Sequence, residues 1–223
     1  MVEVEVLAVE EQVGVGKKIF LDKKEKELIS KEIENLEKLS SAELVAVIAK
    51  KSSDYKYATL MISIVIVFLI SFVLSISKEI SSFSLLQYQL LALIGINIIF
   101  EKFHSLALKI VPKKYKHYKA SLYAKEQFRN LGLNKTKSKE VIMFFISIEE
   151  RYVKIITDKK ISQKIPNEFW EKVISQFSKD VNNEDFLTAY LNAIKSCNSI
   201  LIEKFPANKN DENELSNEVI ELR

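Results

Sequence analysis

The sequence predicts an α/β domain that is interrupted by a two-helix transmembrane hairpin. Two uncharged apolar runs, residues 58–77 and 80–100, are separated by only two residues. Before the first run, the pattern predicts one helix and one strand, which cannot bury their apolar faces alone. We therefore expect residues 20–57 and 112–206 to pack together as one discontinuous domain, with the hairpin as an insertion.

The two apolar runs have the length and composition of membrane spans. Each has about 20 residues, which at a rise of ~1.5 Å per residue crosses the ~30 Å core of a bilayer. The second run carries Gln87, Gln89 and Asn97, and its apolar pattern either ends at Phe100 or extends to Val111. A buried helix of a soluble protein is the alternative for the first run, and a polar pathway through Asn97 is the alternative for the second.

Before the first run, the sequence predicts a capped helix followed by a strand. Residues 22–39 place Leu and Ile on one helical stripe, and Asp22 and Glu25 have the spacing of a capping box. Residues 41–49 are a short apolar run bounded by polar residues, which indicates a buried strand. Residues 1–19 are a separate segment whose pattern favours no single structure.

After the second run, the sequence predicts a strand hairpin surrounded by helices. Pro112 interrupts the preceding helix, and Gly132 is well placed to end the next one. The two apolar strands are separated by a short acidic turn and should pair with each other. The expected elements are a helix at 113–131, strands at 140–147 and 151–157, a helical turn at 158–165, helices at 166–181 and 184–205, and a polar tail at 207–223.

Composition excludes several classes of protein. The chain has 223 residues, a formal net charge of +3 and a single cysteine, Cys197, so it has no intramolecular disulfide and no cysteine cluster for zinc. Only Arg129, Arg151 and Arg223 are arginines, whereas nucleic-acid readers rely on arginine for bidentate contacts. We therefore expect no nucleic-acid partner. The acidic amino-terminal sequence is not typical of a cleavable signal peptide.

Lysine placement predicts the orientation of the hairpin. Basic residues are concentrated before the first run and after the second, whereas the turn offers only Lys78 beside Glu79. Because basic flanks stay in the cytoplasm, both termini should be cytoplasmic and the turn should be outside. The expected location is a bacterial-type inner membrane, crossed by two spans.

Several short motifs follow the apolar runs in a fixed order. They run from Ala124-Lys-Glu-Gln-Phe128 through Leu131-Gly132-Leu133 to Glu140-Val-Ile-Met-Phe-Phe-Ile-Ser147, and then to Phe169-Trp170. This order resembles the TPM-domain family, in the membrane subgroup with two transmembrane helices, and the resemblance covers most of residues 20–206. It implies a small α/β/α sandwich. Some family members are weak acid phosphatases, some bind calcium, and others are accessory factors of membrane complexes.

The resemblance also implies candidate metal ligands. Asp54, Glu150, Asp158 and Asp185 line up with the loop carboxylates of the family. If loops at the strand ends bring Asp54 near Asp158, the converging carboxylates can bind Ca²⁺ or Mg²⁺, since these ions prefer oxygen ligands. The alternative is that each carboxylate caps a helix or solvates a turn.

A basic cluster follows Pro112. Lys113, Lys114, Lys116 and Lys119 are candidates for contact with anionic lipids, and the alternative is that they only set the orientation of the hairpin.

The sequence offers little support for catalysis. Cys197 lacks the arginine six positions later that a tyrosine-phosphatase loop requires, because that position is Glu203. The chain also lacks the Asp-x-Asp pair of the aspartyl-phosphate enzymes. We therefore expect a non-enzymatic accessory or assembly factor whose partners are the lipid bilayer and another membrane protein. The alternative is a weak, metal-assisted acid phosphatase.

Overall fold

The computed structural model describes residues 21–76, 81–183, 185–207 and 213–222. The chain divides into two compact units, of which one contains residues up to 52 and from 117 onward, and the other contains residues 53–116. Each unit is described by itself. The predicted segment 1–19 and the turn at Lys78 and Glu79 lie outside the described residues.

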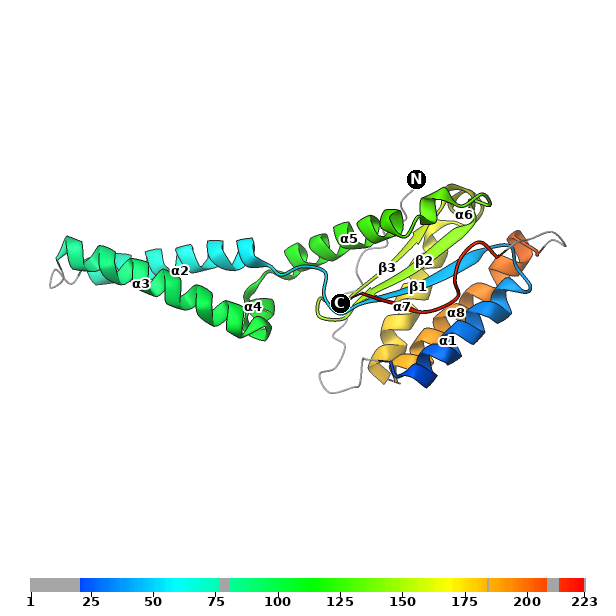
Figure 1. Ribbon diagram of the computed structural model, residues 1–223, viewed down its shortest axis with the longest axis horizontal. Helices are drawn as coiled ribbons and strands as arrows, with labels where there is room; N and C mark the ends of the chain where they lie inside the picture. The colour runs from blue at the N-terminus through cyan, green and yellow to red at the C-terminus, as the bar shows by residue number, and fades with distance from the viewer. Residues whose placement is uncertain (1–20, 77–80, 184, 208–212, 223) are drawn as a thin grey trace. The chain divides into compact units, whose positions relative to one another are not determined.

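A four-stranded sheet forms the centre of the first unit (Figure 1). The strand order is β3-β2-β1-β4, in which β1 is parallel to both β2 and β4 and β2 is antiparallel to β3. The predicted strand hairpin is thus confirmed. The strands are β1 (Glu43–Ala49), β2 (Val141–Ser147), β3 (Tyr152–Thr157) and β4 (Ile220–Leu222).

Helices cover one face of the sheet with the larger core. This layer contains α1 (Lys23–Glu37), α7 (Asn167–Asn183) and α8 (Phe186–Lys204). Trp170, Tyr190 and Phe144 are buried in it, and the rings of Phe144 and Tyr190 lie 5.0 Å apart. The capping box predicted for α1 is present, with the Glu25 N–H donating to Asp22 at 2.9 Å.

A single helix, α5 (Lys113–Asn130), covers the opposite face. Ala120, Ala124 and Phe128 of α5 pack on the alternate residues of β1, β2 and β3. Because every residue of β1 and β2 is buried, both strands lie between two helical layers. Gly132 (φ 71°) ends α5 and leads to the 3₁₀ turn η1 (Leu133–Lys135), and the short α6 (Lys159–Lys164) follows β3. The α/β/α sandwich that the resemblance implies is confirmed.

The carboxyl-terminal residues differ from the polar tail expected at 207–223. Ile220–Leu222 form β4 beside β1, and the Lys50 N–H donates to the Leu222 carbonyl at 2.9 Å. Leu215, Ile220 and Leu222 pack against the core beneath α5. This apolar contact explains why the end of the chain is ordered although its composition is polar.

The second unit contains the two apolar runs as helices α2 (Lys56–Ile76) and α3 (Ser82–Lys102). The two helices contact each other, and α2 buries Thr59, Ser63, Val67 and Ser71, which recur every four residues. The second run does not continue as one helix to Val111, because α3 ends at Lys102 and a separate α4 (His104–Ile110) follows. The helix is interrupted at Phe103, whose φ of −113° and ψ of 71° are not helical.

Candidate functional site

Asp158 and Glu150, two of the predicted metal ligands, lie at opposite ends of the sheet. Asp158 follows β3 at the end where Ile142 pairs with Thr157, whereas Glu150 lies in the turn where Ser147 pairs with Tyr152. Five residue steps along β3, at ~3.3 Å each, separate these ends by roughly 17 Å. One cation therefore cannot contact both carboxylates.

Glu150 organises the end of the sheet at which the chain leaves the first unit. Its side chain is 2% exposed and accepts hydrogen bonds from the Ser147 hydroxyl and, at 3.0 Å, from the Ser52 N–H. The Ser52 and Ser147 hydroxyls lie 2.6 Å apart. Ser52 is the last residue of the first unit before the insertion. This buried network thus fixes the chain just before it enters the apolar helices.

Asp158 and Asp185 act as helix caps. The Asp158 carboxylate accepts the Lys159 N–H at 2.6 Å, and its second oxygen is buried with no hydrogen-bond partner among the described residues. Asp185 accepts both the N–H and the hydroxyl of Thr188 at 2.8 Å, and these bonds hold its pKa below the usual range. Both positions therefore fit the capping alternative.

The fourth predicted ligand, Asp54, is exposed and belongs to the second unit. Across the described residues, no group of three or more His, Cys, Asp or Glu side chains could hold a metal ion. The binding of Ca²⁺ or Mg²⁺ therefore stays a prediction that rests on the resemblance.

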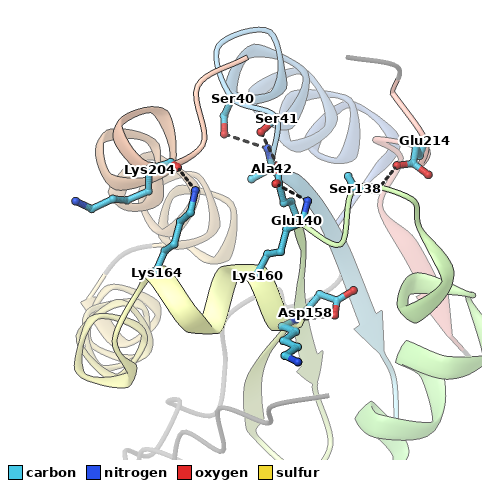
Figure 2. Close-up of polar contacts among 11 residues, drawn as sticks. Ser40, Ser41, Ala42, Ser138, Glu140, Asp158, Lys160, Lys164, Lys204 and Glu214 are labelled. Atoms are coloured by element: carbon cyan, nitrogen blue, oxygen red, sulfur yellow. Dashed lines mark hydrogen bonds and ion pairs between the residues drawn. The ribbon is translucent and has the colours of Figure 1, made fainter. Parts of the chain in front are cut away.

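Polar side chains gather at the amino ends of β1 and β2 (Figure 2). Glu140 accepts a hydrogen bond from the Ser41 hydroxyl at 2.6 Å and pairs with Lys160 at 3.1 Å. The carboxylate of Glu214 accepts the backbone N–H groups of Lys137 and Ser138 at 2.8 and 2.9 Å. Glu214 comes from the carboxyl-terminal segment, so that segment is fastened to the loop that precedes β2.

Beside these contacts, a cavity of about 240 Å³ lies between the end of α1, the start of β1 and the carboxyl-terminal segment. Glu37 accepts the Leu44 N–H at 3.1 Å and the Asn213 amide at 3.4 Å. Glu43 accepts the Glu214 N–H at 2.9 Å. The cavity is lined by Glu34, Glu37, Lys38, Ser40, Ser41, Ala42, Glu43, Asn213 and Asn217.

Glu37 is a titratable group of this cavity whose pKa is raised. Burial raises its pKa to about 7 from the ordinary 4.5, and the neighbouring charge of Glu43 adds to this effect. The side chain therefore changes charge near neutral pH. Sequence reasoning missed this group, because Glu37 looks like any polar residue of an amphipathic helix. The signal would have been an ordered segment at Asn213–Asn217, where the composition indicated a tail.

The predicted basic cluster is divided by the structure. Lys113 and Lys114 are exposed in the first turn of α5, whereas the Lys116 ammonium donates to the Leu108 carbonyl at 2.8 Å. Lys119 is partly exposed and belongs to the first unit. Lys113 and Lys114 are thus the members that most resemble a solvent-facing pair.

Helices α2 and α3 are both 21 residues long and apolar enough to cross a membrane. Their large side chains are mostly exposed, as in Phe68 and Phe72 of α2, with exposed fractions of 67% and 61%, and Leu91 of α3, with 67%. A core helix of a soluble protein would bury such side chains. Length, composition and exposure therefore agree with a membrane-spanning pair.

The chain resembles known proteins in its fold and in part of its sequence. A solved structure, the NMR structure of BA42 protein from the psychrophilic bacterium Bizionia argentinensis, matches with a TM-score of 0.55 and 18% identity, over 91% of this chain and 95% of that one. At this identity the match shows the fold alone. No curated protein matches the chain. The family model of the TPM domain matches residues 100–200, which include α5, β2, β3 and α7, and this part of the chain is therefore similar to a TPM domain.

Proposed function

We propose that the chain is an integral membrane protein whose TPM domain serves as a non-enzymatic accessory factor in the assembly or maintenance of other membrane proteins. One observation carries the proposal. Strands β1 and β2 pair in parallel from Glu43 to Ala49, although the two apolar helices lie between them in the sequence. A hairpin inserted between neighbouring strands tethers the domain twice, which suits a module that works at the membrane surface.

The local structure supports a tether without a long linker. Residues 50–55 alone connect β1 to α2, and an extended chain of that length reaches roughly 20 Å at most. The Glu150 network holds the first part of this connection. The domain therefore has little freedom to search the cytoplasm, and its partners are expected within or beside the bilayer.

The acidic residues support an accessory role over catalysis. Asp158 and Asp185 cap helices, and Glu150 accepts hydrogen bonds that organise the sheet end. Each of these three carboxylates therefore has a structural role that explains its presence. The metal-assisted phosphatase has no comparable observation in its favour.

Membrane insertion is tested with an arginine placed in the span. Leu69→Arg introduces a charge into α2 at a side chain that is 56% exposed, and Leu28→Arg on α1 is the matched control at 50% exposed. An arginine in the middle of a span costs about 3 kcal/mol of insertion free energy. We expect Leu69→Arg to increase the fraction extracted from membranes by carbonate and Leu28→Arg to behave like the wild type. Complete extraction of the wild type would contradict the proposal.

The orientation is tested with single cysteines. Burial raises the pKa of the Cys197 thiol to about 12, so the native cysteine should react little with maleimides. In intact cells, a membrane-impermeant maleimide should label Ser81→Cys at the start of α3 and leave Lys23→Cys on α1 unlabelled until the cells are lysed. The reverse pattern would place the TPM domain outside the cytoplasm.

The accessory role is tested by removing the gene from the source organism. We expect at least one membrane complex to lose abundance, and both the wild type and Leu28→Arg to restore it. Leu69→Arg should restore it less well, since the domain would be poorly tethered. Unchanged abundance and assembly of all membrane complexes after deletion would argue against the accessory role, whatever the outcome of the extraction test.

A further inference from the structure

The chain turns sharply where α3 ends, and we call residues 102–114 the elbow. Phe103 leaves the helical conformation with φ −113° and ψ 71°, and the seven-residue α4 follows. The Lys116 ammonium donates to the Leu108 carbonyl at 2.8 Å, which fastens α4 to the first turn of α5. The elbow is therefore a defined structure.

One side of the elbow carries an exposed apolar stripe. Phe103, Leu106 and Ile110 have the spacing i, i+3 and i+7 and are 54%, 39% and 41% exposed. Ala107 and Val111, on the other side, are each 2% exposed. The apolar residues of α4 thus serve two surfaces, one packed within the unit and one that faces outward.

Lysines flank this apolar stripe. Lys102, Lys109, Lys113 and Lys114 are all exposed, and Glu101 is the acidic residue beside them. An apolar stripe bordered by cations is typical of helices that lie in the headgroup region, where the stripe meets the acyl chains and the ammonium groups meet phosphates. The positive charge favours anionic phospholipids over zwitterionic ones.

The position of the elbow in the chain also favours a location in the headgroup region. The elbow begins at Lys102, the last residue of α3, which is long and apolar enough to cross a membrane. If α3 spans the bilayer, its end lies at the headgroup level. The elbow, which follows directly, then lies at the membrane interface.

We infer that the elbow is an interfacial element that binds the headgroups of anionic phospholipids. This inference rests on the proposed membrane insertion of α2 and α3, and it adds a specific ligand class and a surface to that proposal. Phe103, Leu106 and Ile110 enter the boundary between headgroups and acyl chains. Lys102, Lys109 and Lys114 contact lipid phosphates.

Depth measurements test the location of the elbow. The full chain is reconstituted into vesicles of phosphatidylcholine with phosphatidylglycerol, and nitroxide labels are placed at Leu106→Cys, at Leu69→Cys in α2 and at Lys23→Cys on α1. Collision rates with oxygen and with a water-soluble nickel complex report depth. We expect Leu69 deep in the bilayer, Leu106 at the headgroup boundary and Lys23 in water.

Each other result has a distinct meaning. A deep Leu69 with Leu106 in water overturns the elbow inference and leaves membrane insertion standing. A Leu106 label protected from both oxygen and nickel indicates that protein covers the stripe, which also overturns the inference. A Leu69 label in water overturns membrane insertion and, with it, the lipid-facing elbow.

Lipid selectivity tests the charges. Binding of phosphatidylglycerol and phosphatidylcholine to the detergent-solubilised full chain is measured by native mass spectrometry. Each lysine should contribute about a fivefold preference, so Lys102→Gln/Lys109→Gln/Lys114→Gln should weaken phosphatidylglycerol binding by roughly 100-fold. The control Lys23→Gln/Lys24→Gln/Lys31→Gln removes three exposed lysines from α1 and should change binding less than twofold. Equal losses in both triple variants, or a loss in neither, would overturn the inference.

Discussion

Glu37→Gln should stabilise the protein at pH 8 and have little effect at pH 5. The pKa of Glu37 is raised from 4.5 to about 7, because burial and the charge of Glu43 disfavour the ionised form. A raised pKa contributes stability that is fully present below pH 4.5 and is lost as the pH rises through 7. Glutamine stays neutral and keeps an oxygen that can accept the Leu44 N–H. The variant should therefore keep the stability that the wild type loses when Glu37 ionises.

The magnitude follows from the two pKa values. The interval from 4.5 to about 7, at ~1.4 kcal/mol for each pH unit, sets an upper limit of about 3.5 kcal/mol for the stability lost above neutrality. The Glu37 side chain is partly exposed, and solvent screening reduces this value. We expect the difference in unfolding free energy between variant and wild type to grow by about 2 kcal/mol from pH 5 to pH 8.

The assay uses the single tryptophan of the chain. Trp170 is fully buried in the core of the first unit, so its fluorescence reports unfolding of that unit in the detergent-solubilised full chain. Urea unfolding is measured at several pH values between 5 and 8.5. Glu34→Gln is the matched control on the same helix, because pairing with Lys38 lowers the pKa of Glu34. Parallel stability curves for Glu37→Gln and the wild type would refute the argument from burial.

Three further variants test other parts of the fold. Glu150→Ala should destabilise the domain by about 2 kcal/mol in urea unfolding, because a buried hydroxyl and a partly buried N–H lose their acceptor; no change would mean that water replaces the carboxylate. Asp185→Ala should cost about 1 kcal/mol at pH 7 through the lost cap of α8. Since the pKa of Asp185 is lowered, this cost should fade as the pH drops below 4, and a constant cost would contradict the assignment. Leu222→Pro should disrupt β4 and speed hydrogen exchange of the Lys50 amide, and unchanged protection would show that the pairing is dispensable.

The elements with local signals were predicted well from the sequence. The capping box at Asp22 fixed the start of α1, and the acidic turn before Arg151 identified the strand hairpin. The packing of the β1 segment with the residues after the insertion followed from the need of a lone helix and strand for partners, and the structure identifies β2 as a neighbour of β1. In each case a few neighbouring residues, or one simple packing rule, were sufficient.

Features that depend on distant contacts were not predictable. β4 has three residues, and its order comes from β1 and the core beneath α5 rather than from its own composition. The acidic cavity was missed for the same reason, since Glu37 acquires its environment only when the carboxyl-terminal segment packs beside it. The resemblance identified each candidate carboxylate singly and gave no distances between them. These distances depend on which end of the sheet each carboxylate occupies.

The strand order has a consequence for how the protein is made. β1 pairs with β2 on one side and with β4, at the last described residues, on the other. At a synthesis rate of about 5–20 residues per second, the ribosome needs roughly ten seconds or more after Ala49 before Leu222 is available. During that interval one edge of β1 lacks its partner β4, although the apolar hairpin has already been synthesised. Completion of the sheet is therefore a late step that follows synthesis of the hairpin, and the unfinished domain is the species that a chaperone would encounter.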